Sequence, residues 1–340
     1  MNWQSALVPG NAPDGKPILS LIAKRTYTIS SEKVRISFHQ LPLCSTEITS
    51  DPQNQLSSET LAESDLIAYK PKTDVVVLSK VYAPEGRRTY SVHCEVDIGQ
   101  LHKEISVFGD RRIESKMIRG LRFSDPVPFE SKDLGYMHSY GGKIKTGDGL
   151  LLHYPPNPIG KGFCLNDSRN KITEINVPTC EDPEHPLKPS DLMIDKYKNW
   201  GRAPKPVSFG WTKASFFPRY TYATAENKFN SSTESSVRQI DYRFFQGASD
   251  GMCDHVLLGN EHVKLTFMDP MHPIFEFDLP GDKPVLLLYL AGEEFELEPV
   301  LQTVLIDKEK EVLSMVWRGF REYAGIEELK KMKINYKCKT

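Results

Sequence analysis

Asp74 is the first residue that invites a chemical interpretation, because its carboxylate stands at the start of an apolar run. In the stretch YKPKTDVVVLSKVYAPEG, residues 69–86, it directly precedes VVVL. Many α/β enzymes keep a catalytic acid beside a buried strand, but their active sites lie at the carboxyl ends of the strands, the opposite end from Asp74. Aspartate at a strand start commonly accepts backbone hydrogen bonds. We therefore expect Asp74 to fix the KPKTD loop against the amide of a neighbouring strand, with Lys70 or Lys72 as charged partner.

A second possible chemistry is glycoside hydrolysis by an acid pair, formed by Asp241 with Asp250 or Asp254. Such pairs hold their carboxyl groups about 5 to 10 Å apart across a cleft. The alternative function is therefore a carbohydrate-active hydrolase on a β-rich scaffold with aromatic platforms. A deep cleft holding both carboxyls would favour it.

Metal and nucleophile chemistry find little support in the spacing of the residues. His255 and His262 flank VLLGNE, but Gly259 and Asn260 predict a turn between them and no HExxH motif is present. The chain has no GxSxG motif, and the glycine-rich segments VFGDRR, HSYGGK and NPIGKGF lack the strand-to-helix context of a phosphate site. We expect no catalytic residue, no metal and no cofactor.

Composition excludes several classes of function. The chain has 340 residues, a net charge of -2 and 39% hydrophobic residues, which is typical of a globular protein. A protein that binds nucleic acid through phosphate contacts usually carries a clustered basic face, which this chain lacks. The beginning has no export-signal pattern, and no window reaches the roughly 18 to 20 apolar residues of a membrane span. We expect a cytoplasmic protein that binds neither nucleic acid nor membrane.

The cysteines agree with a reducing compartment. They lie far apart, without a CxxC pair or a zinc-type cluster, and a chain of this length does not need disulfides to hold its core. The six residues are Cys44, Cys94, Cys164, Cys180, Cys253 and Cys338.

Alternating apolar and polar residues predict strands in both ends of the chain. In the N-terminal part they form a hairpin over 18–41 and a meander whose three strands cover 73–84, 89–99 and 101–112. Further strands are expected at 262–269, 274–281, 283–292, 294–307 and 311–320. Helical patterns occur only at 190–201, between Ser190 as N-cap and Gly201 as stop, and in the tail at 325–334. The predicted fold is mainly β, with antiparallel, sandwich-like sheets and few helices.

The chain divides into three regions: an N-terminal β meander at 1–124, a middle at 125–239, and a C-terminal β region with a short terminal helix at 240–340. All three are expected to form one domain. The middle is irregular and rich in Pro, Gly and aromatic residues. It is too aromatic for a disordered linker, and long ordered loops often carry function or cover sheet edges.

The middle also concentrates the residue types that dominate protein interfaces, namely Trp, Tyr, Phe and Arg. If these side chains are exposed, they would bind a partner protein, and open sheet edges would be a further docking surface. The candidates are Trp200, Arg202, Phe209, Trp211, Phe217, Arg219, Tyr220 and Tyr222.

An ordered series of segments over residues 19–319 resembles one large bacterial family. The segments are KRTYTI, YKPKTDVVVLSKVYAP, VFGDRR, PFESKDLGYMHSYGG, NPIGKGF, PKPVSFGW, FFPRYTYA, DYRFFQGASDGM, LLGNEHVKLTFMDP, FDLPG and VWRG. The family, long catalogued as a domain of unknown function, comprises adaptors or chaperones of type VI secretion encoded near PAAR-type spike-tip proteins and toxic effectors. The resemblance implies a non-enzymatic protein that binds an effector or its PAAR-like carrier and helps to load it onto the secretion spike. Through these partners it would also contact the spike trimer.

Overall fold

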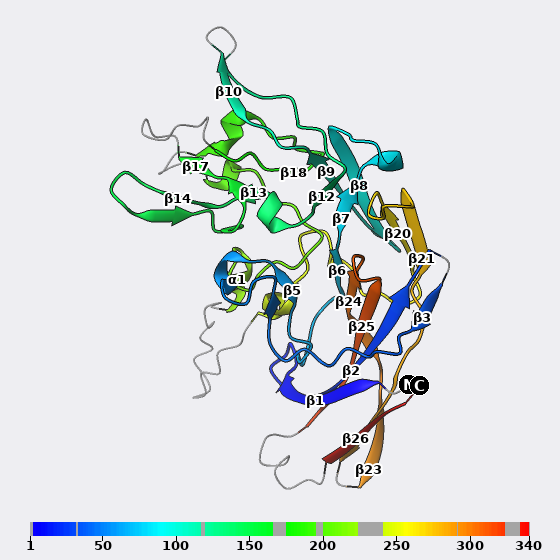
Figure 1. Ribbon diagram of the computed structural model, residues 1–340. Coiled ribbons are helices and arrows are strands. Elements are labelled where there is room, and N and C mark those ends of the chain that lie inside the picture. The colour runs from blue at the N-terminus through cyan, green and yellow to red at the C-terminus, as the bar shows by residue number, and fades with distance from the viewer. Residues whose placement is uncertain are drawn as a thin grey trace.

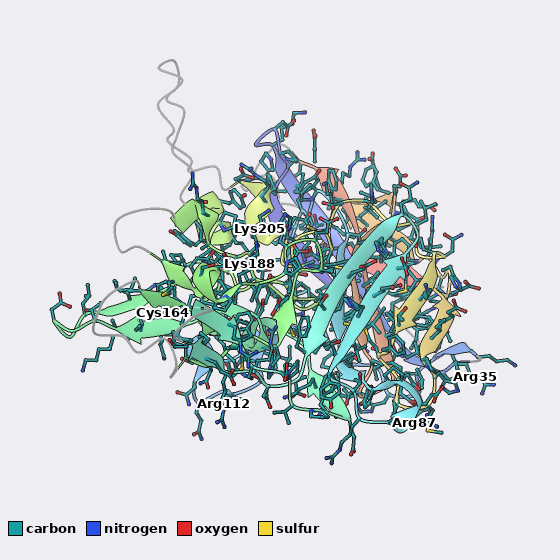
Figure 2. All side chains as sticks on the ribbon, turned by 90° about the horizontal axis from the view of Figure 1, so that it is seen from above. Arg35, Arg87, Arg112, Cys164, Lys188 and Lys205 are labelled. Atoms are coloured by element: carbon teal, nitrogen blue, oxygen red, sulfur yellow. The ribbon has the colours of Figure 1, made fainter. Side chains whose placement is uncertain are left out.

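The computed structural model describes residues 3–31, 33–116, 120–165, 175–194, 200–223, 241–290, 292–323 and 334–339. Within these residues the protein is mainly β, with several sheets and one short α-helix, α1 (Arg219–Ala223), which confirms the predicted fold class. None of the described helices is long and apolar enough to cross a membrane. Charged side chains such as Arg35, Arg87 and Arg112 point outward from the body (Figure 2).

The largest sheet joins strands from both ends of the chain (Figure 1). Its strands, in spatial order, are β1 (Gln4–Asn11), β2 (Pro17–Ile29), β25 (Val312–Glu322), β24 (Val300–Asp307) and β6 (Asp74–Leu78), with β3 (Val34–Ile36) beside β2. All pairings are antiparallel except that of β6 with β24. The N-terminal and C-terminal regions therefore complete one sheet together.

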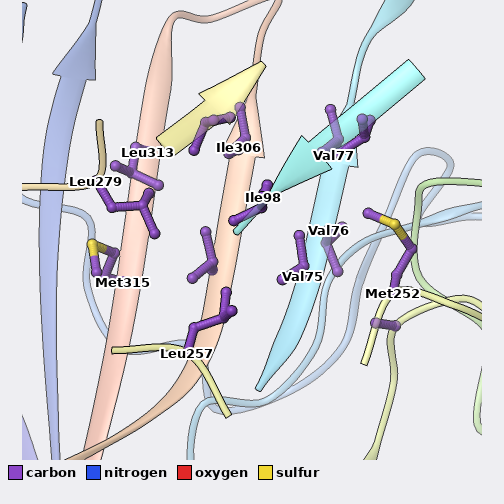
Figure 3. Close-up of a cluster of buried hydrophobic side chains, with 14 of the residues drawn as sticks. Val75, Val76, Val77, Ile98, Met252, Leu257, Leu279, Ile306, Leu313 and Met315 are labelled. Carbon is purple, nitrogen blue, oxygen red and sulfur yellow. The ribbon is translucent and has the colours of Figure 1, made fainter. Parts of the chain in front are cut away.

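A second sheet is built around the β8–β9 hairpin. Its order is β18 (Cys180–Glu181), β9 (Leu101–Phe108), β8 (Ser91–Ile98), β20 (His262–Thr266) and β21 (Ile274–Asp278). One cluster of buried side chains connects this sheet with the first (Figure 3). Ile98 of β8 lies in this cluster with Val77 of β6 and Ile306 of β24, all at most 3% exposed. This cluster is the main core, and the two large sheets form its layers.

A third sheet and a group of short strand pairs complete the described structure. The three-stranded sheet has the order β23 (Glu293–Leu297), β22 (Val285–Leu290) and β26 (Ile334–Lys339). The pairs are β4 (Ile48–Thr49) with β5 (Thr60–Ala62), β7 (Lys80–Tyr82) with β12 (Ser131–Asp133), β10 (Ile113–Lys116) with β11 (Gly120–Phe123), β13 (Tyr140–Gly141) with β16 (Lys161–Gly162), β14 (Lys143–Lys145) with β15 (Leu151–His153), and β17 (Cys164–Leu165) with β19 (Met193–Ile194).

The middle region has its own small core, which supports its interpretation as ordered chain. Tyr140, Tyr154 and Phe163 are buried together, with ring centroids 5.1 and 5.9 Å apart along the series. Ile113, which precedes the expected boundary at residue 125, belongs to the same cluster. The middle therefore packs as a compact lobe beside the sheets, visible at the upper left of Figure 1 around β13, β14 and β17.

Several predicted elements are wrong in pairing or type. Strand β6 does not form a meander with β8 and β9; it pairs in parallel with β24 in the other sheet, because its valine run is buried on both faces. The segment expected as a helix from Ser190 begins as a 3₁₀ turn at Pro189–Leu192 and continues as β19, since its side chains complete the small core. The predicted tail helix lies mostly outside the described residues, which resume with β26.

Further short 3₁₀ turns connect the strands. They are η1 (Gln55–Ser57), η2 (Pro84–Gly86), η3 (Tyr136–His138), η6 (Trp200–Arg202) and η7 (Tyr242–Phe245).

Candidate functional site

The two faces of the first sheet differ in chemistry, and the polar face leads to the candidate site. Side chains alternate along a strand, so the registers place Lys24, Val316, Thr303 and Asp74 in one row across β2, β25, β24 and β6. The opposite face, with Tyr27, Leu313, Ile306 and Val77, enters the main core. Residues 41–73, here called the belt, supply acidic partners to the polar face.

Asp74 is fully buried and acts as a hub of hydrogen bonds. Its carboxylate accepts from Lys70 Nζ at 2.6 Å, from Gln246 Nε2 at 2.7 Å, and from the amides of Gly247 and Ala248 at 3.0 and 3.1 Å. The structural role predicted for Asp74 and its pairing with Lys70 are thus confirmed. The amides belong to a loop rather than to the expected strand. Lys72 lies at the surface, 3.8 Å from Asp254.

The loop that reaches Asp74 requires a glycine. A Cβ on Gly247 would lie 2.5 Å from Glu63 Oε2 and 2.8 Å from the ring of Trp211. A larger residue would force Glu63, the ring of Trp211 or the loop itself to shift.

Belt carboxylates form further buried ion pairs. Asp65 accepts from Lys24 Nζ at 2.8 Å and also from the backbone amide of Cys44 at 2.7 Å. Glu63 receives Arg219 Nη2 at 2.8 Å. Such pairs contribute little net stability, but removing one partner leaves a buried charge uncompensated. The belt and the segment around Arg219 are therefore tied to the polar face of the sheet.

The burial of three candidate partner-binding residues contradicts their expected exposure. Phe209 and Trp211 are 0% and 5% exposed, and Trp211 donates Nε1 to the carbonyl of Leu61 at 3.3 Å. Arg219 is 6% exposed and donates Nε to the carbonyl of Phe244 at 2.8 Å. The segment that carries both rings runs along the outer edge of β6, where the amide of Val77 donates to the carbonyl of Phe209. This position places the rings of Phe209 and Trp211 in the main core.

Other candidates remain at the surface. Phe217 and Tyr220 are 45% and 42% exposed, and their ring centroids lie 6.2 Å apart in an edge-to-face arrangement. Arg202 is exposed, and Tyr222 is half-buried beneath the guanidinium of Arg243 at 4.2 Å. The side chain of Trp200 lies outside the described residues. Among the candidate residues, Phe217 and Tyr220 therefore form an exposed aromatic pair.

The acids proposed for a hydrolase are engaged separately. Asp241 forms an ion pair with Arg243 at 2.5 Å, which lowers the pKa of Asp241, and Asp254 faces Lys72. Asp250 contributes its backbone carbonyl to Lys103. None of the three lines the cavity described below, and nothing in these contacts favours glycoside hydrolysis.

The two histidines singled out from the sequence have separate surroundings. His262 hydrogen-bonds to Asp278 at 2.8 Å, and His255 is exposed. Within the described residues, the one group of potential metal ligands comprises Asp182, Glu184 and His185. The hydrogen bonds of a turn bring these three residues together: the carboxylate of Asp182 accepts from the amide of Glu184 at 2.9 Å and lies 3.0 Å from Nδ1 of His185. All six cysteines are free thiols.

A cavity of about 360 Å³ opens between the belt, the β6–β7 segment and the middle region. Its walls include Leu61, Tyr136, Trp211 and Phe216, and Glu59 also lines it. This volume lies at the lower end of the range of roughly 300 to 1,000 Å³ found for ligand pockets. The cavity adjoins the predicted aromatic segment through Phe209, Trp211 and Phe216.

Three titratable groups that line the cavity have shifted pKa values, and burial raises the pKa of one of them, Tyr136, to about 12. Burial raises the pKa of Glu59; the hydrogen bond from the Met137 amide opposes this effect, and the neighbouring carboxylate of Asp133 adds to it. Burial lowers the pKa of His138, and the positive charge of Lys161 lowers it further. No sequence pattern points to Glu59 or to the belt acids Glu63 and Asp65, because they lie in segments without a hydrophobic period or a motif.

Comparison with known proteins gave one match. A family described as an uncharacterized protein conserved in bacteria, DUF2169, matches residues 14–318. This span includes the second large sheet, the belt, the middle region and most of the first sheet, of which β1 and the last residues of β25 lie outside the match. No curated protein and no solved structure matched the chain.

Proposed function

The chain belongs to this bacterial family, and from that premise we propose that it is a non-enzymatic adaptor of type VI secretion. In this proposal it binds a toxic effector or the PAAR-like carrier of an effector in the cytoplasm and helps to load it onto the secretion spike. The resemblance of the ordered segments supports the secretion role, and the match over residues 14–318 supports a bacterial origin for the chain.

The observation that carries the binding role is the exposed aromatic pair of Phe217 and Tyr220. In the sequence the two residues flank Arg219, whose buried guanidinium is held by Glu63 and by the carbonyl of Phe244. A rigidly held pair of rings offers a large contact area at a low cost in side-chain entropy, which is why aromatic residues dominate interface hot spots. Arg219 therefore positions the surface without touching the partner.

Capture of the proteins encoded by flanking genes tests this proposal. Replacing Phe217 and Tyr220 by Ser should weaken capture of the cognate effector or carrier by about 1 to 4 kcal/mol, as truncated hot spots do. The melting temperature should change little, because nearly half of each residue is already exposed to water. The matched control replaces Leu150 and Leu151, which are 52% and 56% exposed, by Ser. Equal capture by both double variants would remove the aromatic pair as the docking surface.

A further inference from the structure

Glu59 is a carboxylate inside a cavity for which the described residues supply no ion-pair partner. Each lysine that lines the same cavity already faces another acid: Lys80 faces Asp133 at 3.3 Å, Lys213 faces Glu47 at 2.7 Å, and Lys310 faces Asp307 at 2.7 Å. A half-buried carboxylate without a counter-ion is costly, because burial removes part of its hydration. The cavity therefore has an unmatched negative charge.

The backbone around Glu59 holds its carboxylate in place. Oε1 accepts the amide of Met137 at 2.7 Å. Gly135, whose φ is +139°, lies against the same oxygens, and a Cβ there would be 2.3 Å from Oε1. The turn at 135–137 thus binds the carboxylate of Glu59 and fixes its position. The described contacts give the other oxygen, Oε2, no hydrogen-bond donor, so it is free to accept one.

The walls of the cavity suit the aliphatic or planar part of a basic side chain. Tyr136 and Phe216 pack edge to face at 5.9 Å, and Trp211 and Phe209 line the same space. Aromatic rings attract guanidinium and ammonium groups through the negative charge of their faces. A long basic side chain would bury its stem against these walls and place its charge at Glu59.

We propose that this cavity binds an arginine or lysine side chain presented by the partner protein, with Glu59 as its counter-ion. The inference rests on the proposed adaptor function and identifies the chemistry of one anchor that the partner inserts. The raised pKa of Glu59 agrees with a half-buried carboxyl group that has no counter-ion in the described residues, and a bound guanidinium would lower that pKa.

Short peptides test the cavity without a partner protein. The probes are N-acetylated, C-amidated Gly-Arg-Gly and Gly-Lys-Gly, with Gly-Gln-Gly as the uncharged control, titrated into the full chain by calorimetry. We expect the basic peptides to bind and the Gln peptide not to bind. Glu59→Gln keeps an acceptor for the Met137 amide and removes the charge, so it should weaken binding about tenfold or more. Glu130→Gln, which changes an exposed acid outside the cavity lining, should leave binding unchanged.

Capture assays then separate this inference from the proposed function. If the unaltered protein captures its partner and Glu59→Gln captures it equally well, the basic anchor is wrong and the adaptor role stands. If the unaltered protein captures neither flanking product, the adaptor role fails, while the peptide titrations still report on the cavity. A wild-type capture competed by Gly-Arg-Gly but not by Gly-Gln-Gly would support the anchor without any variant. Basic peptides that bind no better than the Gln peptide would overturn it.

Discussion

Lys70 and Asp74 lie four residues apart and form an ion pair of 2.6 Å at the edge of the largest sheet, with side chains only 2% and 0% exposed. Asp74 follows the loop and begins β6, while Lys70 Nζ also reaches Thr303 Oγ1 of β24 at 3.4 Å. The pair thus connects the belt, two strands and the loop at 246–248. An acid that looks catalytic in sequence acts here as the junction between separate segments.

Neutralising this junction should cost more than the loss of an ordinary hydrogen bond. Asp74→Asn leaves Lys70 as a buried charge without a carboxylate, and breaking such pairs costs about 3 to 5 kcal/mol. Chemical denaturation measures the free energy of unfolding. The control is Lys72→Met at the exposed pair with Asp254, which should change stability by about 1 kcal/mol or less. Similar losses for both variants would show that burial does not determine the cost.

Trp211→Ala should destabilise the fold rather than a binding surface. The ring is buried against Gly247 and beside the cavity, and truncating a buried aromatic residue costs about 3 to 5 kcal/mol. Capture and melting temperature should therefore fall together. If the variant lost capture at an unchanged melting temperature, Trp211 would instead have to contact the partner directly.

The strand content was predictable from sequence, whereas the partners of each strand were not. The alternation in Pro17–Ile29 and in the hairpin of β8 and β9 depends on local side-chain chemistry, which the sequence displays directly. The parallel pairing of β6 with β24 joins residues more than two hundred positions apart, and no local pattern encodes it. The burial of Trp211 and Arg219 follows from the same long-range packing. The half-buried position of Glu59 could not be predicted either, because it depends on the contacts of Glu59 with Gly135 and Met137, which lie more than seventy residues away in the sequence.

The ion pair of Asp269 with Lys308 predicts a loss of stability in acid. Burial raises the pKa of Asp269, but the hydrogen bonds from Lys308 and from the amides of Met271 and His272 outweigh it and lower the pKa to about 2. A depressed carboxyl pKa stabilises the folded state above the unfolded value of 3.8, and this contribution disappears as the pH falls through about 2. The stability advantage of the unaltered chain over Asp269→Asn should therefore shrink over this acid range. An advantage that stays constant with pH would contradict the assignment.

Arg318 offers a route to a more stable protein. Its side chain lies on the polar face of β25 and is 3% exposed, yet the described residues provide no carboxylate for it. The guanidinium lies 4.7 Å above the ring of Tyr69 and 5.2 Å above that of Phe320, and Nη2 donates to the carbonyl of Lys70 at a long 3.4 Å. In the part of the chain that the structure describes, Nε and Nη1 have no hydrogen-bond partner. Burial lowers the pKa of Arg318 to about 10, which is the expected consequence of an uncompensated charge.

Arg318→Met should keep the packing against both rings and remove the buried charge. Replacing buried charges by apolar residues of similar volume is often neutral or stabilising by about 1 to 4 kcal/mol, so the free energy of unfolding should rise or stay level. Arg318→Ala is the matched control, since it removes the same charge but leaves a cavity and should destabilise the fold by comparison. Denaturant titration at neutral pH compares the three proteins. A loss of several kcal/mol in the Met variant would mean that Arg318 has a partner that stabilises its charge.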